Sequence, residues 1–213
     1  MPKTDPAAAR EARFWDGLAE RYAKKPVADQ ASYERKLALT QARLSPEMAL
    51  LELGCGTGST AIAHAPFVRE VLATDISPKM VEIARRKAAA AGLSNVAAEV
   101  GRLEALAFPP GRFDAILSMS LLHLLEDPAA ALKQVHGWLK PDGLLISTTP
   151  CLAESHNWLR FLAPLAQPLG LFPKPIRFFT EAWLREAHEA AGFTIEERWS
   201  PGPKKPVFLI ARA

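Results

Sequence analysis

The chain has 213 residues, 49% hydrophobic and 23% charged, which is typical of a globular domain with a buried core. Its formal net charge of +3 is too small to indicate a nucleic-acid-binding surface. No apolar run approaches the roughly 18 residues that a membrane-spanning helix needs, and the first residues lack the apolar core of a signal peptide. The two cysteines have no paired spacing, so we expect a soluble protein of the reducing cytoplasm.

The N-terminal stretch from Ala7 to about Leu44 has an amphipathic helical pattern. The aromatic residues Phe14, Trp15 and Tyr22 recur in it at helical spacing. We expect this stretch to dock on the rest of the chain, with Phe14 and Trp15 buried in the contact.

A glycine-rich segment, Glu52-Leu53-Gly54-Cys55-Gly56-Thr57-Gly58, follows an apolar run and precedes a helical run over residues 59–67. This order places the glycines on a tight strand-to-helix turn, where side chains would keep a ligand away from the backbone. Asp75 ends the next apolar run about 20 residues later, where an acid accepts hydrogen bonds from ribose hydroxyls. The segment therefore predicts a ligand that contains a nucleoside.

The spacing of the glycines narrows the choice of ligand. It is G-x-G-x-G, whereas the nicotinamide and flavin fingerprint is G-x-G-x-x-G. The carboxylate of Glu52, beside the turn, would repel a pyrophosphate but suits a cationic ligand that carries an amine. Glycines also form ordinary loops, but the complete segment with Asp75 at this distance favours a cofactor site.

Apolar runs and helical patterns alternate through the rest of the chain, which predicts an α/β fold with helices on both faces of a mostly parallel sheet. A helix should begin at Pro78, with Ser77 as its cap and Gly92 as its stop. A turn is expected at residues 141–143. The proline-rich loop 201–206 indicates that the last two strands form an antiparallel hairpin. Seven strands are expected. One precedes the glycine turn, and the other six lie at residues 70–74, 95–100, 113–118, 144–149, 193–199 and 207–211. Further helices are expected at residues 129–139 and 180–191.

Residues 152–179 form an insert rich in large apolar side chains. They include Trp158, Phe161 and Phe172, and prolines at 164, 168, 173 and 175 prevent one regular helix. Such an insert suits a hydrophobic or aromatic substrate. A peripheral membrane contact, a homodimer contact and packing on the protein's own core remain open as alternatives.

The glycine segment resembles the motif of class I S-adenosylmethionine-dependent methyltransferases, and the likeness covers roughly residues 45–213. It is strongest to the small-molecule enzymes of ubiquinone and menaquinone biosynthesis, whose LHHL segment corresponds to Leu122-His123-Leu124. The segment from Phe14 to Tyr22 looks like their lid helix. The resemblance implies a Rossmann-like fold, a helical lid at residues 1–44, a methyltransferase domain at residues 45–213 and a substrate wall formed by the insert 152–179.

The resemblance also implies the residues that hold S-adenosylmethionine. Asp75 would bind the ribose, and Tyr22 would cover the methionyl end. Lys36 or Arg35 would reach the methionyl carboxylate, with a solvated helix face as the alternative for both. Arg102 stands where many relatives have an adenine-binding aspartate, and because arginine cannot accept a hydrogen bond we expect it to stack on the adenine or to point to solvent. The expected cofactor-binding residues are Tyr22, Lys36, Glu52, Gly54, Cys55, Gly56, Gly58, Asp75, Ile76, Met80, Arg102, Leu103, Ser118 and Met119.

Methyl transfer from a sulfonium is an in-line displacement, in which positioning and desolvation supply much of the acceleration. His123 is the candidate base because histidine titrates near neutrality, with a hydrogen-bonded pocket residue as the alternative. Substrate contacts are expected from His123, Trp158, Phe161 and Phe172.

Several functions are disfavoured by what the sequence lacks. Residues 118–121 do not form the Asn/Asp-Pro-Pro-aromatic tetrapeptide of nucleobase methyltransferases, and no cluster has metal-ligand spacing. We therefore expect O- or C-methylation of a small, apolar or aromatic acceptor, without a metal and without nucleic acid. The alternative is a non-catalytic or non-methylating S-adenosylmethionine-binding protein whose apolar insert serves as a partner or membrane surface.

Overall fold

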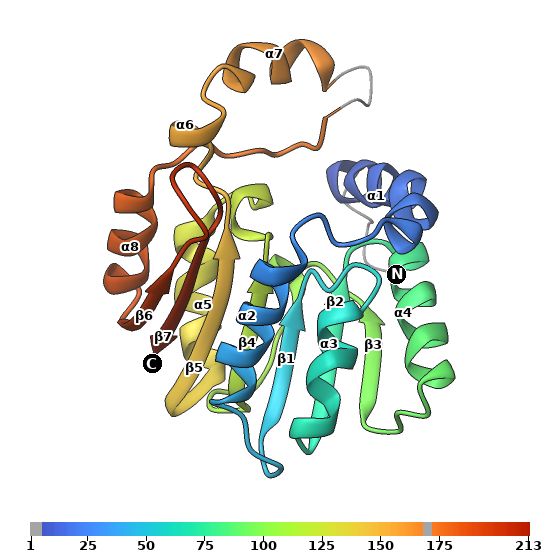
Figure 1. The fold of residues 1–213 in the computed structure, drawn as a ribbon. Helices are drawn as coiled ribbons and strands as arrows, with labels where there is room; N and C mark the ends of the chain where they lie inside the picture. Colours follow the sequence, from blue (N-terminus) through green and yellow to red (C-terminus); the bar gives the residue numbers. More distant parts are fainter. Residues whose placement is uncertain (1–5, 168–171) are drawn as a thin grey trace. The chain divides into compact units, whose positions relative to one another are not determined.

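The computed structural model describes residues 6–167 and 172–213, and the chain forms two compact units, Met1–Ala107 and Phe108–Ala213. Its strands make a Rossmann-like seven-stranded sheet in the order β3-β2-β1-β4-β5-β7-β6 (Figure 1). The predicted α/β class, the mostly parallel sheet and the C-terminal antiparallel hairpin are confirmed. The expected boundary between a lid and a methyltransferase domain at residue 44 stays a prediction.

The first unit contains three parallel strands, of which β1 is buried at every position. A strand buried on both faces reads as a continuous apolar run, which is how residues 48–51 appear in the sequence. The elements of this unit are α1 (Pro6–Lys24), α2 (Gln30–Gln41), β1 (Ala49–Leu53), α3 (Ser59–His64), η1 (Ala65–Phe67), β2 (Glu70–Asp75), α4 (Pro78–Ala90), β3 (Val96–Val100) and η2 (Leu103–Ala105).

The N-terminal helices are held by apolar contacts and by caps. Trp15 of α1 packs against a buried cluster that contains Ala19, Met80 and Ile83, which confirms its predicted docking role. Figure 1 shows α1, in blue, beside α4. The break between α1 and α2 contains Pro26, because proline cannot continue a helix.

The second unit combines a parallel pair, β4 with β5, and antiparallel pairs of β7 with β5 and with β6. The insert forms two short helices and not one regular helix, but the break between them at residues 156–158 contains no proline and Pro164 lies inside the second helix; Pro168 lies outside the described residues. The elements of this unit are β4 (Phe113–Met119), η3 (Leu122–Leu124), α5 (Pro128–Trp138), β5 (Leu139–Thr149), α6 (Leu152–Ser155), α7 (Leu159–Ala166), α8 (Glu181–Ala190), β6 (Thr194–Trp199) and β7 (Val207–Arg212).

Two expected boundaries were wrong. The turn expected at residues 141–143 is an irregularity inside β5, where Asp142 has a φ of 64° and the register with β4 shifts between Phe113 and Ala115. The register with β4 passes from Leu139 directly to Leu144, so residues 140–143 bulge out of the strand, and the expected turn chemistry is retained inside β5. The helix expected over residues 59–67 ends at His64 and continues as a 3-10 turn that contains Pro66.

Candidate functional site

The glycine turn between β1 and α3 has the backbone geometry that the sequence predicted. Gly54, Gly56 and Gly58 have φ values of 65°, 53° and 76°, which side chains disfavour. A Cβ at Gly58 would lie 2.7 Å from the Cβ of Ala84, so this glycine lets the turn approach α4 closely. A Cβ at Gly56 would meet nothing within 4 Å. The backbone at Gly56 therefore borders open space that a ligand can fill.

Asp75, at the end of β2, fixes this turn to the start of α4. One carboxylate oxygen accepts a hydrogen bond from the Gly56 N–H at 2.8 Å, and the other accepts one from the Ser77 N–H at 2.9 Å. The pKa of Asp75 is raised above its ordinary value. Burial is the main cause and the charge of Asp16 adds to it, while the hydrogen bonds from Ser77 and Gly56 act in the opposite direction. Each oxygen keeps a second lone pair, so the carboxylate can also accept from ribose hydroxyls.

Asp16 of α1 extends this hydrogen-bond network, and sequence reasoning missed its role. Its Oδ1 accepts from the Ser77 hydroxyl at 2.5 Å and from the Lys79 N–H at 3.1 Å, while the Ser77 hydroxyl accepts from the Met80 N–H. Asp16 thus adds a second cap to α4 and ties α1 to the segment that follows the ribose-binding candidate. The only signal in the sequence was its position next to Trp15 in the lid-like segment.

Glu52 is 1% exposed, and its Oε2 atom has no hydrogen-bond partner. Its carboxyl accepts from the Ala61 backbone N–H, which lowers its pKa, but burial and the charge of Asp75 raise that pKa to about 8. Burial also raises the pKa of the neighbouring Cys55 thiol, which makes a thiolate unfavourable. An acid with one unpartnered oxygen at the glycine turn fits the ammonium group of S-adenosylmethionine.

Helix α2 places Tyr33 and Lys36 in half-buried positions. The pKa of Tyr33 is raised by burial and by Glu52, while a side-chain hydrogen bond with Thr60 lowers it. Burial lowers the pKa of Lys36, against the opposite effect of Asp29. Tyr33 was missed in the sequence, where its position one helical turn before Lys36 was the available signal.

The expected adenine-side residues lie near the end of β2, since the Gly101 N–H donates to the Asp75 carbonyl at 2.9 Å. Arg102 does not extend freely into solvent, because its Nε lies 3.0 Å from an Oε atom of Glu104. Leu103 is buried and Ile76 is half-buried. The ion pair explains how an arginine is held at this position, while its contact with adenine stays a prediction.

Two other candidates of the first unit have clear structural positions. Met80 is 2% exposed and packs in the cluster under α1, so in this structure it supports that helix. Tyr22 is 54% exposed on α1. Their contacts with a cofactor stay predictions.

In the second unit, the candidates at the end of β4 are Ser118 and Met119, followed by His123 in η3. Ser118 is buried with an unpartnered hydroxyl, and the Met119 sulfur accepts from the Thr148 hydroxyl at 3.4 Å. Burial lowers the pKa of His123 to about 4, and its Nδ1 has no partner. A neutral imidazole of this pKa is a weak base at neutral pH.

Arg177, a further residue that sequence reasoning missed, fixes the end of the insert to the loop that carries His123. Its backbone N–H donates to the His123 carbonyl at 2.7 Å, and its guanidinium contacts the Leu125 carbonyl and the Glu126 carboxylate. The insert and the His123 loop are therefore joined within one unit.

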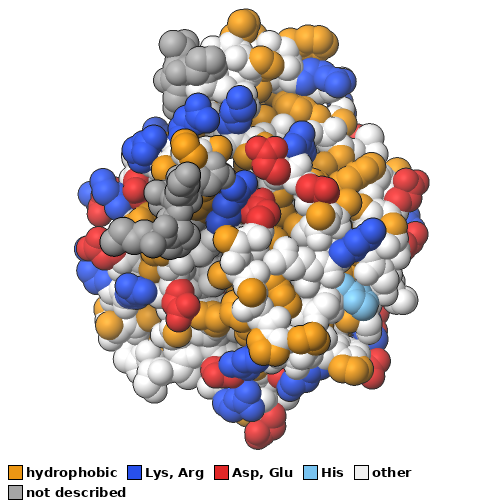
Figure 2. Space-filling model, turned by 180° about the vertical axis from the view of Figure 1, so that it is seen from behind, with side chains coloured by type: hydrophobic (Ala, Val, Ile, Leu, Met, Phe, Trp, Pro, Cys, Tyr) orange, Lys and Arg blue, Asp and Glu red, His pale blue; other side chains and the backbone are white. Residues whose placement is uncertain are grey.

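Helix α7 of the insert carries an exposed apolar stripe, formed by Trp158, Phe161, Leu162 and Leu165. Their exposed fractions are 58%, 72%, 47% and 72%, and their spacing of i, i+3, i+4 and i+7 places them on one helix face. Figure 2 shows hydrophobic side chains, in orange, over this part of the molecule. The substrate candidate Phe172 is half-buried.

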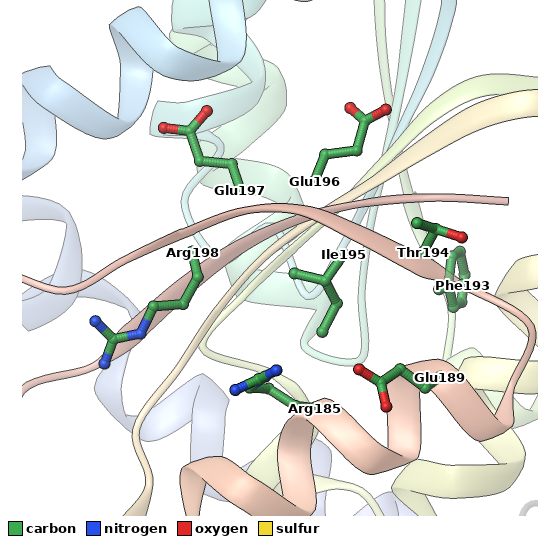
Figure 3. Close-up of a pocket in the computed structure, with 8 residues that line it drawn as sticks. All are labelled: Arg185, Glu189, Phe193, Thr194, Ile195, Glu196, Glu197 and Arg198. Atoms are coloured by element: carbon green, nitrogen blue, oxygen red, sulfur yellow. The ribbon is translucent and has the colours of Figure 1, made fainter.

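A separate hollow of about 510 Å³ lies between α8 and β6. Figure 3 shows its lining side chains, among them Arg185 and Glu189 of α8 and Ile195 of β6. Arg198 of this lining pairs with Glu181 at 2.7 Å. The lining includes no residue of the predicted site, so we assign it no function.

Residues 6–167 and 172–213 contain no group of three or more His, Cys, Asp or Glu side chains arranged to hold a metal ion. Within the same ranges, every helix is too short or too polar to cross a bilayer.

Comparison with known proteins agrees with this geometry. Residues 50–143 match the family model described as a methyltransferase domain. The chain is 33% identical over 147 residues to the ubiquinone biosynthesis O-methyltransferase of Xanthomonas axonopodis pv. citri (strain 306), which covers 68% of this chain and 59% of that protein. The chain spans about half the length of the curated relatives that it matches.

Two solved structures show the fold. An S-adenosylmethionine-dependent methyltransferase from Mesorhizobium loti has a TM-score of 0.69 at 22% identity and covers 87% of this chain and 99% of its own. The 4+2 cyclase SpnF has a TM-score of 0.77 at 19% identity, with 97% of both chains covered. Residues 50–143 therefore belong to the methyltransferase domain family, and the chain has the fold of the S-adenosylmethionine-dependent methyltransferases.

Proposed function

We propose that the chain binds S-adenosylmethionine at the glycine turn and transfers its methyl group to a small, apolar or aromatic acceptor, by O- or C-methylation in the cytoplasm. The observation that supports this most directly is the turn itself. Gly56 borders open space, Asp75 is fixed beside it, and Glu52 has an unpartnered buried oxygen. These groups match the ribose diol and the primary amine of the donor.

The bound donor would supply an electrophilic methyl group on a sulfonium. The chain's own contribution would be to hold the donor, to exclude water and to orient the acceptor. Asp75 would hold the ribose, and Glu52 would hold the ammonium group. His123, with its pKa lowered to about 4 by burial, fits a pocket residue better than a general base.

The acceptor class is proposed from the insert. The stripe on α7 consists of large apolar and aromatic side chains, and Arg177 joins the insert to the His123 loop. A relative named for ubiquinone biosynthesis supports an aromatic acceptor such as a quinol. A lipid surface or a second copy of this chain is the alternative occupant of the stripe.

A second candidate function is the use of bound S-adenosylmethionine without methyl transfer. The likeness to the cyclase SpnF over 97% of the chain supports it, because that protein is named for a cyclisation. The weakly basic His123 supports it as well, because hydroxyl acceptors benefit from a base.

An assay of labelled methyl transfer from the donor to a panel of quinols, phenols and fatty acids distinguishes methyl transfer from the second candidate function. Label in one class of acceptor, reduced by Asp75→Ala, supports methyl transfer. Donor binding without label in any class would favour the second function. Retained turnover in Phe161→Ser, together with lost sedimentation on lipid vesicles, would assign the α7 stripe to a membrane surface.

A further inference from the structure

The Glu52 carboxyl is enclosed by groups that do not favour a negative charge. It is 1% exposed, it accepts one backbone hydrogen bond from Ala61, and its Oε2 has no partner. A buried carboxylate without a cation and with an unsatisfied oxygen is costly, whereas the neutral acid is not.

The ionisable groups that face Glu52 are all acids. Asp75 on β2 acts on it directly, and Glu52 in turn acts on Tyr33 of α2 and on Cys55 of the turn. None of these three groups supplies Glu52 with a positive charge.

We propose that Glu52 holds a proton in the free protein and releases it when the primary amine of the donor binds. This inference rests on the proposed function, because the amine belongs to S-adenosylmethionine. The acid O–H bond breaks, its electron pair stays on the carboxylate, and the proton passes to the buffer. The product is an ion pair between the carboxylate and the ammonium group, and no other bond changes.

The expected size of the effect follows from the burial of Glu52. With its pKa raised to about 8, Glu52 is about nine-tenths protonated at pH 7, so about 0.9 proton should leave per donor bound. The apparent dissociation constant should fall about tenfold from pH 6 to pH 7. The test stays below about pH 7.2, because an α-amino group loses its own proton at roughly pH 7.7–8.0.

Isothermal titration at pH 7 in buffers of different ionisation enthalpy measures the proton release directly. S-adenosylhomocysteine is the ligand with the amine, and 5′-methylthioadenosine is its control, because it keeps the nucleoside but lacks the amine. We expect about 0.9 proton for the first ligand and almost none for the second.

Glu52→Gln keeps the shape of the side chain but has no proton to release. It should bind S-adenosylhomocysteine more weakly and without proton release. Glu82→Gln is the matched control, since Glu82 is exposed on α4, and it should behave as the wild type.

Three results would overturn the inference. They are binding of S-adenosylhomocysteine with less than about 0.3 proton released, equal release with 5′-methylthioadenosine, and undiminished release in Glu52→Gln. If Glu52→Gln does not fold, the comparison of the two ligands on the wild type decides alone. Failure of the wild type to bind either ligand would instead contradict the proposed function itself.

Discussion

His64 should make the protein sensitive to mild acid. It ends α3, directly after the glycine turn, with a fully buried side chain and no hydrogen-bond partner for either ring nitrogen. Burial lowers its pKa from 6.5 to about 4. The unfolded chain therefore binds a proton near pH 6.5 that the folded protein does not bind until about pH 4.

This difference in proton binding sets the direction in which stability changes with pH. The stability that the neutral side chain contributes is fully present above pH 6.5 and is lost as the pH falls toward 4. At pH 5 the unfolded state gains about 2 kcal/mol from this group alone, and at pH 7.5 it gains almost nothing. His123 and His188, whose pKa values burial also lowers, add to the loss in the same direction.

Urea denaturation of the wild type and of His64→Leu at pH 7.5 and at pH 5 isolates the contribution of His64. The free energy of unfolding of the wild type should fall between the two pH values by about 2 kcal/mol more than that of the variant. Equal losses within about 0.5 kcal/mol would refute the assignment of a buried neutral His64.

Five substitutions test the site and the contacts that hold it. Asp75→Ala should weaken donor binding by about 1–3 kcal/mol, because the ribose hydroxyls would lose their acceptor; unchanged affinity by titration would remove Asp75 from the ribose site. Gly56→Val should abolish donor binding, because its side chain would enter the open space at the turn, and normal affinity would discredit that model. The comparison is Gly58→Ala, which shares the strain of a positive φ and whose Cβ would also meet Ala84, so it should lower stability in thermal unfolding without placing a side chain in the open space at Gly56. Asp16→Ala should lower the free energy of unfolding by about 1 kcal/mol through loss of a helix cap, and an unaltered urea midpoint would argue against the observed contact. His123→Asn should keep turnover within about threefold, and a much larger loss would identify a base.

The parts of the structure that depend on local chemistry could be predicted from the sequence. The spacing of the glycines, with Asp75 after them, predicted the strand-to-helix turn, and Ser77 with Pro78 predicted where α4 begins. The proline-rich loop at residues 201–206 indicated the antiparallel pair of β6 and β7. In each case the residue type is required at that position by backbone geometry or by a cap.

The parts that depend on distant contacts could not be predicted. Asp16 caps a helix that begins 62 residues later, and its local pattern shows only an acid on an amphipathic helix. Tyr33 becomes relevant only because folding brings it near Glu52. The start of β5 was misplaced because Leu139 pairs with Phe113 before the turn chemistry of Pro141, Asp142 and Gly143 bulges the strand, and this pairing depends on a distant partner.

Isothermal titration of the wild-type protein with S-adenosylmethionine, S-adenosylhomocysteine and NAD tests the donor site most directly. In the glycine turn, Asp75 is fixed beside the backbone and the Oε2 atom of Glu52 has no hydrogen-bond partner. This geometry predicts micromolar binding of the first two ligands and none of NAD. Absence of binding by both sulfur ligands, or binding of NAD in their place, would contradict the assignment.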